Sequence, residues 1–106
     1  MKTIVVATDF SERSDRAIRR AKLLAREFDS MLHLVHVVDD DQPQLIVKAE
    51  QDASTKLLEE LTHTLVELDA VKCDFRVVLG KPFFGITQAA RELSADLIVI
   101  GPHRRQ

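Results

Sequence analysis

The sequence is poor in several features that mark large classes of protein. Its single cysteine excludes an internal disulfide and suits a reducing cytosol. Its net charge of −2 supplies no excess of positive charge for a polyanion such as nucleic acid. No apolar run approaches the roughly 20 residues of a membrane helix, and no secretory leader opens the chain. We therefore expect a cytoplasmic protein that binds neither nucleic acid nor membranes.

The motifs of common catalytic sites are missing as well. The sequence has neither the Gly-Lys-Ser/Thr of a P-loop nor the Gly-x-Ser-x-Gly of a hydrolase. Three consecutive aspartates at 39–41 suggest the acidic pocket of a receiver domain. A receiver also needs an aspartate at the end of its third strand, where this chain has Val-Leu-Gly at 78–80, so we reject that interpretation. With no identifiable general base or phosphate-binding lysine, we expect no enzymatic activity.

What the sequence does contain is a regular alternation of apolar runs and helical patterns in one domain, residues 1–106. Runs near 3–8, 31–38, 72–79 and 96–100 predict four strands. The first run is apolar at every position, which is typical of a fully buried parallel strand. Helical periodicity fills the three intervals, and the second helix spans about 44–68. The β-α-β-α-β-α-β order implies an α/β fold, an open parallel sheet with helices on both faces.

Each helical pattern has an apolar stripe that we expect to pack on the sheet. The start of the second helix, 46–49, is less regular, and we expect it to be loose. The predicted inner faces are Ala17, Ile18, Ala21, Leu24, Ala25 and Phe28 in the first helix, Leu57, Leu58, Leu61, Leu65 and Leu68 in the second, and Ile86, Ala89, Ala90 and Leu93 in the third.

Two positions at strand ends are candidates for a binding site. Asp9 follows the first strand at the carboxyl edge of the predicted sheet, where ligands of open parallel sheets bind. Two interpretations stay open: Asp9 forms a hydrogen bond to a bound nucleotide or helps to hold a cation, or Asp9 or Ser11 caps the next helix. Gly101 follows the fourth strand and is either a phosphate-loop glycine or a turn residue.

Histidine and cysteine provide no metal site by their spacing. His33 and His36 are three apart in a strand, so their side chains point to opposite faces. His63 has a glutamate one helical turn away on either side, a spacing more typical of a solvated charged face. Cys73 has no CxxC partner and is expected to be a small core or edge residue. We expect no bound metal ion at these residues.

Four motifs in order resemble the universal stress protein family. They are Ile-Val-Val-Ala-Thr-Asp-Phe-Ser-Glu at 4–12, His-Leu-Val-His-Val-Val at 33–38, Gly-Lys-Pro at 80–82 followed by Ile86 and Ala90, and Asp-Leu-Ile-Val-Ile-Gly at 96–101. The resemblance covers the whole chain. It implies a Rossmann-like, adenine nucleotide alpha hydrolase-like fold of five parallel strands, usually a homodimer through the last strand. On this basis we expect the chain to lack the C-terminal helix and strand of the family.

The resemblance also implies a nucleotide site. The matching positions are Asp9, the main chain at Val37, and Gly101, which begins the phosphate loop. The second glycine of that loop falls on Arg104, whose guanidinium suits a phosphate but whose side chain hinders close approach of the main chain. The third glycine and its hydroxyl partner fall beyond Gln106.

Two functions therefore stay open at this point. The first is a non-catalytic stress-response regulator that acts through protein contacts and senses an adenine nucleotide weakly. The second is an ATP-binding module, with Mg²⁺ accompanying the ATP, whose phosphate loop is completed by residues beyond the chain end.

Overall fold

The computed structural model describes residues 1–101. Its elements are β1 (Thr3–Ala7), α1 (Glu12–Phe28), β2 (Met31–Val38), α2 (Gln44–Glu67), β3 (Cys73–Leu79), α3 (Pro82–Glu92) and β4 (Leu97–Val99). The predicted order of strands and helices is confirmed. β4 is shorter than predicted, because its ladder with β1 extends only from Leu97 to Val99.

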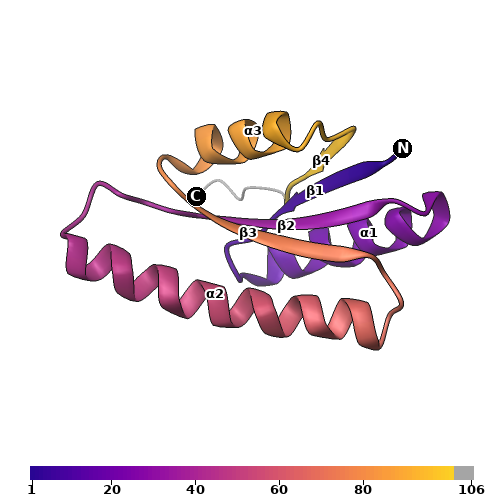
Figure 1. Ribbon diagram of the computed structural model, residues 1–106, viewed down its shortest axis with the longest axis horizontal. Coiled ribbons are helices and arrows are strands. Elements are labelled where there is room, and N and C mark those ends of the chain that lie inside the picture. Colours follow the sequence, from indigo (N-terminus) through magenta and orange to yellow (C-terminus); the bar gives the residue numbers. More distant parts are fainter. Residues whose placement is uncertain (102–106) are drawn as a thin grey trace.

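The sheet is parallel and has the strand order β3-β2-β1-β4. The chain moves from β1 outward through β2 to β3, then crosses back to place β4 on the other side of β1. Helices α1 and α2 cover one face of the sheet and α3 covers the other (Figure 1). The direction of the strand order therefore reverses between β1 and β4, and their carboxyl ends form the kind of crevice in which α/β proteins bind ligands.

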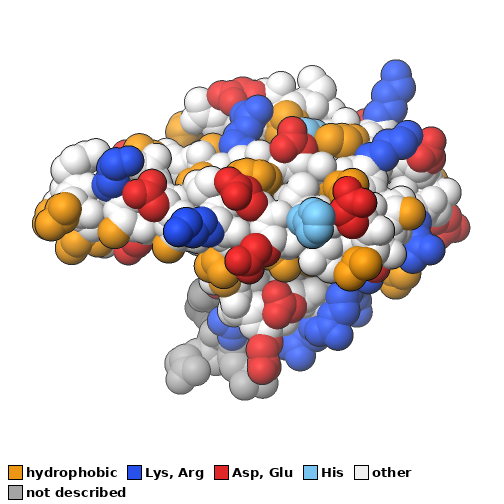
Figure 2. Space-filling model, turned by 60° about the horizontal axis from the view of Figure 1, so that its bottom comes forward, with side chains coloured by type: hydrophobic (Ala, Val, Ile, Leu, Met, Phe, Trp, Pro, Cys, Tyr) orange, Lys and Arg blue, Asp and Glu red, His pale blue; other side chains and the backbone are white. Residues whose placement is uncertain are grey.

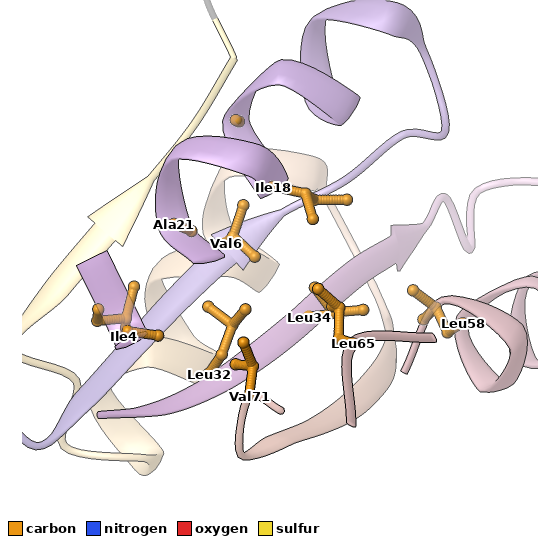
Figure 3. Packing of buried hydrophobic residues seen from close by; sticks show 11 residues of the cluster. Ile4, Val6, Ile18, Ala21, Leu32, Leu34, Leu58, Leu65 and Val71 are labelled. Atoms are coloured by element: carbon orange, nitrogen blue, oxygen red, sulfur yellow. The ribbon is translucent and has the colours of Figure 1, made fainter. Parts of the chain in front are cut away.

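The main core lies between the sheet and the pair α1 and α2. Figure 3 shows side chains of β1 and β2 packed with those of the two helices and with Val71, which precedes β3. Alternation along each strand produces this face. Wholly buried members are Ile4, Val6, Ala21, Leu32, Leu34 and Leu58.

A second, smaller core lies under α3. Val5 and Val35, the alternate residues of the two central strands, pack with Ala89 and Ala90 of α3. Because β1 is buried on both faces, its residues 4–7 are apolar without interruption, whereas β2 also carries His33 and His36. This explains why the first apolar run showed no alternation.

Helix α2 differs from expectation in which residues it buries. Leu57 is 44% exposed and Leu68 is 80% exposed, so the predicted inner face is wrong at both positions. Val47 is 1% exposed and the helix is continuous from Gln44, so its start is not loose. A helix contacts a sheet along one stripe, and here that stripe is Val47, Ser54, Leu58 and Leu65.

Helix α1 carries a similar exception, because Phe28 in its last turn is 49% exposed. The remaining predicted residues of the first and third helical faces are buried or partly buried.

The surface formed by α2 mixes charges of both signs. Figure 2 shows acidic and basic side chains interspersed over this face, with hydrophobic side chains gathered at the end where α2 begins. Leu45, at that end, is 83% exposed. Within residues 1–101, no helix combines the length and the apolar character needed to cross a membrane.

Candidate functional site

A cavity of about 460 Å³ opens at the carboxyl ends of β1 and β2, between the first turns of α1 and α3. Its walls are mainly apolar. Asp9, Val37 and Gly101 all line it, so the structure brings together three positions that are far apart in the sequence. Arg104, the fourth predicted site residue, lies outside the described residues. The cavity coincides with the crevice where the strand order reverses.

Hydroxyl groups hold the loop that presents Asp9. Thr8 Oγ1 accepts from Phe10 N (3.0 Å) and donates to Ser14 Oγ (3.1 Å), which in turn donates to Ser11 O (2.9 Å). Ser11 is the N-cap of α1 and accepts from Ser14 N. Thr8 and Ser14 are buried, so each needs these partners. The predicted capping of α1 by Ser11 is confirmed.

Asp9 itself closes a small turn while remaining at the cavity wall. Its Oδ1 accepts from Ser11 N at 3.0 Å, so the carboxylate stabilises the entry to α1 without being the N-cap. The hydrogen bond from the Ser11 side chain, only partly opposed by burial, lowers the pKa of the Asp9 carboxyl. At neutral pH Asp9 is therefore an anion that only accepts hydrogen bonds.

The main chain of Val37 faces the space beyond the end of β1. Thr8 N still donates to Val35 O (2.9 Å), but Thr8 O lies 2.7 Å from His36 Nδ1. Alternate residues of a parallel strand direct their N–H and C=O groups toward the same neighbouring strand. Val37 thus directs these groups toward the side where β1 has ended. Within residues 1–101 these groups have no hydrogen-bond partner on that side, so a donor and an acceptor are available there for the edge of a planar ligand.

His36 is a cavity residue whose role the sequence did not indicate. Because the Thr8 carbonyl can only accept, His36 Nδ1 carries the hydrogen of this bond. The imidazole also lies 4.6 Å from the ring of Phe10, whose φ of 66° is unusual for a bulky residue. His36 thereby fixes the loop after β1 from the neighbouring strand. The only available signal was its position next to Val37 at a strand end.

Gly101 lies against the main chain of α1. A Cβ atom at this position would be 2.7 Å from Arg13 O and 2.8 Å from Arg13 C. Glycine is therefore required here by close packing. The sequence suggested only a phosphate-loop glycine or a turn residue. The contact brings the segment after β4 to the first turn of α1, at the cavity wall.

Helix α3 supplies the opposite wall through Pro82, Phe83 and Ile86. Gly85 lets the helix approach the sheet closely, because a Cβ there would lie 2.9 Å from Val37 Cγ2. The sequence identified Ile86 as an inner-face residue but did not identify Phe83 as part of a site.

Metal-binding and thiol chemistry have little support in the described part of the chain. Residues 1–101 contain no group of three or more His, Cys, Asp or Glu side chains arranged to hold a metal ion. Cys73 is partly buried at the start of β3, and burial raises the pKa of its thiol to about 11. The group is protonated at neutral pH and therefore a poor nucleophile.

Over residues 1–106 the sequence matches the family model described as Universal stress protein family. The chain belongs to the universal stress protein family. It is 31% identical over 112 residues to universal stress protein A homolog 2 of Coxiella burnetii, covering 98% of this chain and 77% of the relative. It is also 31% identical to universal stress protein MJ0531 of Methanocaldococcus jannaschii, covering 94% of this chain and 64% of that relative.

Solved structures of the family have the same fold. A member from Burkholderia pseudomallei superposes with a TM-score of 0.84 at 29% identity, over 96% of this chain and 82% of the other. A universal stress protein in complex with cAMP superposes with a TM-score of 0.74 at 26% identity, over 92% of this chain and 74% of the other. The α/β fold with a Rossmann-like parallel sheet is thus that of universal stress proteins.

Proposed function

We propose that this universal stress protein is a non-catalytic stress-response regulator that binds an adenine nucleotide in the cavity beside Asp9. One observation carries the proposal: Asp9, Val37 and Gly101 line a single cavity at the reversal point of the sheet. A related protein of known structure is in complex with cAMP, an adenine nucleotide, which supports the same ligand class.

The chemistry of the cavity suits a nucleoside. Apolar walls from Val35, Val37 and Ile86 can cover the faces of a base. The main-chain groups of Val37 on the side where β1 has ended can pair with its edge, as they offer one donor and one acceptor. The anionic carboxylate of Asp9 can accept from an amino group or a ribose hydroxyl. Arg13, also at the wall, places one positive charge near the phosphate end.

The alternative within the same class is tight binding of ATP with Mg²⁺. The family resemblance implies that tight ATP binding needs a phosphate loop, which would begin at Gly101 in this chain. Arg104 belongs to that part of the sequence. If Arg104 hinders approach of the loop to phosphate, glycine at this position is expected to raise the affinity for ATP. An unchanged affinity in Arg104→Gly would argue against steric hindrance.

Calorimetric titration of the wild-type protein with ATP plus Mg²⁺, AMP and cAMP tests the proposal. We expect at least one of them to bind with submillimolar affinity. In thermal denaturation the same ligand should raise Tm by mass action. Asp9→Ala should abolish the shift in Tm. Asp9→Asn retains an oxygen for the turn at Ser11 but loses the charge, so it separates ligand binding from loop stability. Absence of binding by the wild type at millimolar concentration of all three would refute the proposal.

We further propose that the protein acts in the cytoplasm, through contacts with other proteins, as a homodimer. The single thiol at Cys73 suits a reducing compartment. Within the described residues β4 has a paired strand on one side only, which leaves an edge available for pairing.

A further inference from the structure

Two consecutive phenylalanines follow Pro82 in the first turn of α3 and are largely exposed. Phe83 is 71% exposed and Phe84 is 66% exposed, although burial of a phenyl ring is worth about 2 kcal/mol to a folded protein. Only Phe83 lines the cavity. The pair therefore offers two similar side chains in adjacent positions, of which one is at the proposed site and the other is not.

The helical geometry explains this difference. At 100° per residue, Phe83 is about 60° around α3 from Ile86, whereas Phe84 is about 160° from it. Ile86 and Ala90 face the sheet side, so Phe83 lies at the border of this face and Phe84 lies on the far side of the helix. The contact of Gly85 with Val37 holds α3 at a fixed distance from the sheet. Phe83 is consequently held at the mouth of the cavity.

Among the described residues, the rest of the cavity has no free aromatic face. Its other walls are aliphatic or polar, apart from His36, whose ring is engaged by Thr8 O and Phe10. Asp9 and the main chain of Val37 can recognise the edge and substituents of a planar ring but offer nothing to its face. The aliphatic walls can cover a base, and the exposed phenyl ring at the mouth adds an aromatic face, on which bases stack.

We propose that Phe83 is the stacking platform for the base of the bound nucleotide and determines the preference of the site for a ligand with an aromatic ring. This inference depends on the proposed function, because it assigns a role within the same cavity. The ribose and phosphate then extend from the base toward Asp9, Arg13 and Gly101.

The experiment uses the absence of tryptophan and tyrosine from the sequence. Phe83→Trp introduces a single indole at the cavity mouth, and Phe84→Trp introduces one on the far side of the same helix turn. The probe is whichever of ATP plus Mg²⁺, AMP or cAMP binds the wild type most tightly. We expect saturable quenching of indole fluorescence in Phe83→Trp and none in Phe84→Trp.

Affinity measurements complete the test. Phe83→Ala should weaken binding roughly tenfold. Phe83→Leu keeps an apolar side chain but has no aromatic face, so it should weaken binding nearly as much. Phe84→Ala should bind within about twofold of the wild type, since it does not touch the ligand. Both side chains are exposed, so none of these changes removes buried core volume.

The outcomes separate this inference from the proposed function. If no probe binds the wild type, the proposed function itself is wrong. If the wild type binds while Phe83→Ala and Phe83→Leu bind equally well, the cavity is a nucleotide site and Phe83 has no stacking role. Equal quenching at positions 83 and 84 would also overturn the inference, because the two rings would then report a general apolar surface.

Discussion

At Gly101 the main chain that follows β4 touches the main chain of α1. The expected Cβ position is 2.7 Å from Arg13 O, and a carbonyl in the first turn of a helix cannot rotate away as a flexible side chain does. A residue identified from sequence as a loop glycine thus has its reason in packing. The same contact sets one wall of the cavity.

Gly101→Ala should lower the free energy of unfolding by about 1–3 kcal/mol, as overpacking does elsewhere in well-packed sites. Urea denaturation monitored by circular dichroism measures this change. Arg13→Ala is the matched control: it keeps the main chain that Gly101 contacts, and we expect a change within about 0.5 kcal/mol. Equal stability of Gly101→Ala and the wild type would show that the two segments are free to separate.

The residues of the site differ in how well the sequence could reveal them. Asp9, Val37 and Gly101 follow or end strands, and family motifs mark these positions. Phe83 and His36 gain their places from helix phase and strand pairing, which depend on the assembled sheet. Helix phase relative to Ile86 separates Phe83 from Phe84, but that Phe83 borders a cavity follows from the way α3 lies on the sheet.

At the scale of elements, Asp96 connects β1 and β4 at their amino ends, opposite the crevice. Its Oδ2 accepts from Lys2 N (2.8 Å) and Thr3 N (3.0 Å), so a carboxylate before β4 holds the start of β1. These two hydrogen bonds, first that from Thr3 and then that from Lys2, lower the pKa of the Asp96 carboxyl. Strand pairing and charge therefore act together where β1 and β4 begin.

This link predicts a dependence of stability on pH. The folded-state pKa of Asp96 is below its unfolded value, so the stabilisation is complete above the unfolded pKa, about 4, and is lost as pH falls through the folded pKa. Asp96→Asn should therefore lower stability at pH 7 and show a smaller further loss between pH 4 and pH 2 than the wild type. Urea denaturation across that range measures it, and parallel curves for the two proteins would contradict the prediction.

Helix α2 shows the limit of element prediction. Its apolar residues outnumber the positions that one contact stripe can bury, and periodicity alone included Leu57 and Leu68 in that stripe. The structure buries Leu58 and Leu65 of the predicted face and adds Val47 and Ser54. Which residues are buried depends on how α2 packs against β2 and β3, and the sequence of the helix alone does not contain this.

For the whole molecule, the described sheet has β4 at one edge. Ile98 of this strand is 38% exposed and Ile100 after it is 50% exposed. Unpaired main-chain groups beside apolar side chains favour pairing with another chain. Ile100 and Gly101, which follow this edge strand, also line the cavity. Self-association at the edge and ligand binding would therefore use adjoining surfaces.

A polypeptide of residues 1–106 should accordingly self-associate, and light scattering coupled to size exclusion measures its mass. Ile98→Lys adds a charge to the edge strand and should reduce association. Leu45→Lys is the control, because Leu45 is 83% exposed at the start of α2, away from this edge, and its substitution should leave association unchanged. A monomer at every concentration would contradict the prediction.

The sequence by itself determined the order of the elements, the burial of the central strands and the family, because each of these depends on local periodicity or on short motifs. The tertiary structure decided which segments meet: Asp9, His36, Phe83 and Gly101 come from four places in the chain. The strand order β3-β2-β1-β4 assembles them around one cavity. Strand order arises from long-range pairing and packing, so no local stretch of sequence contains it.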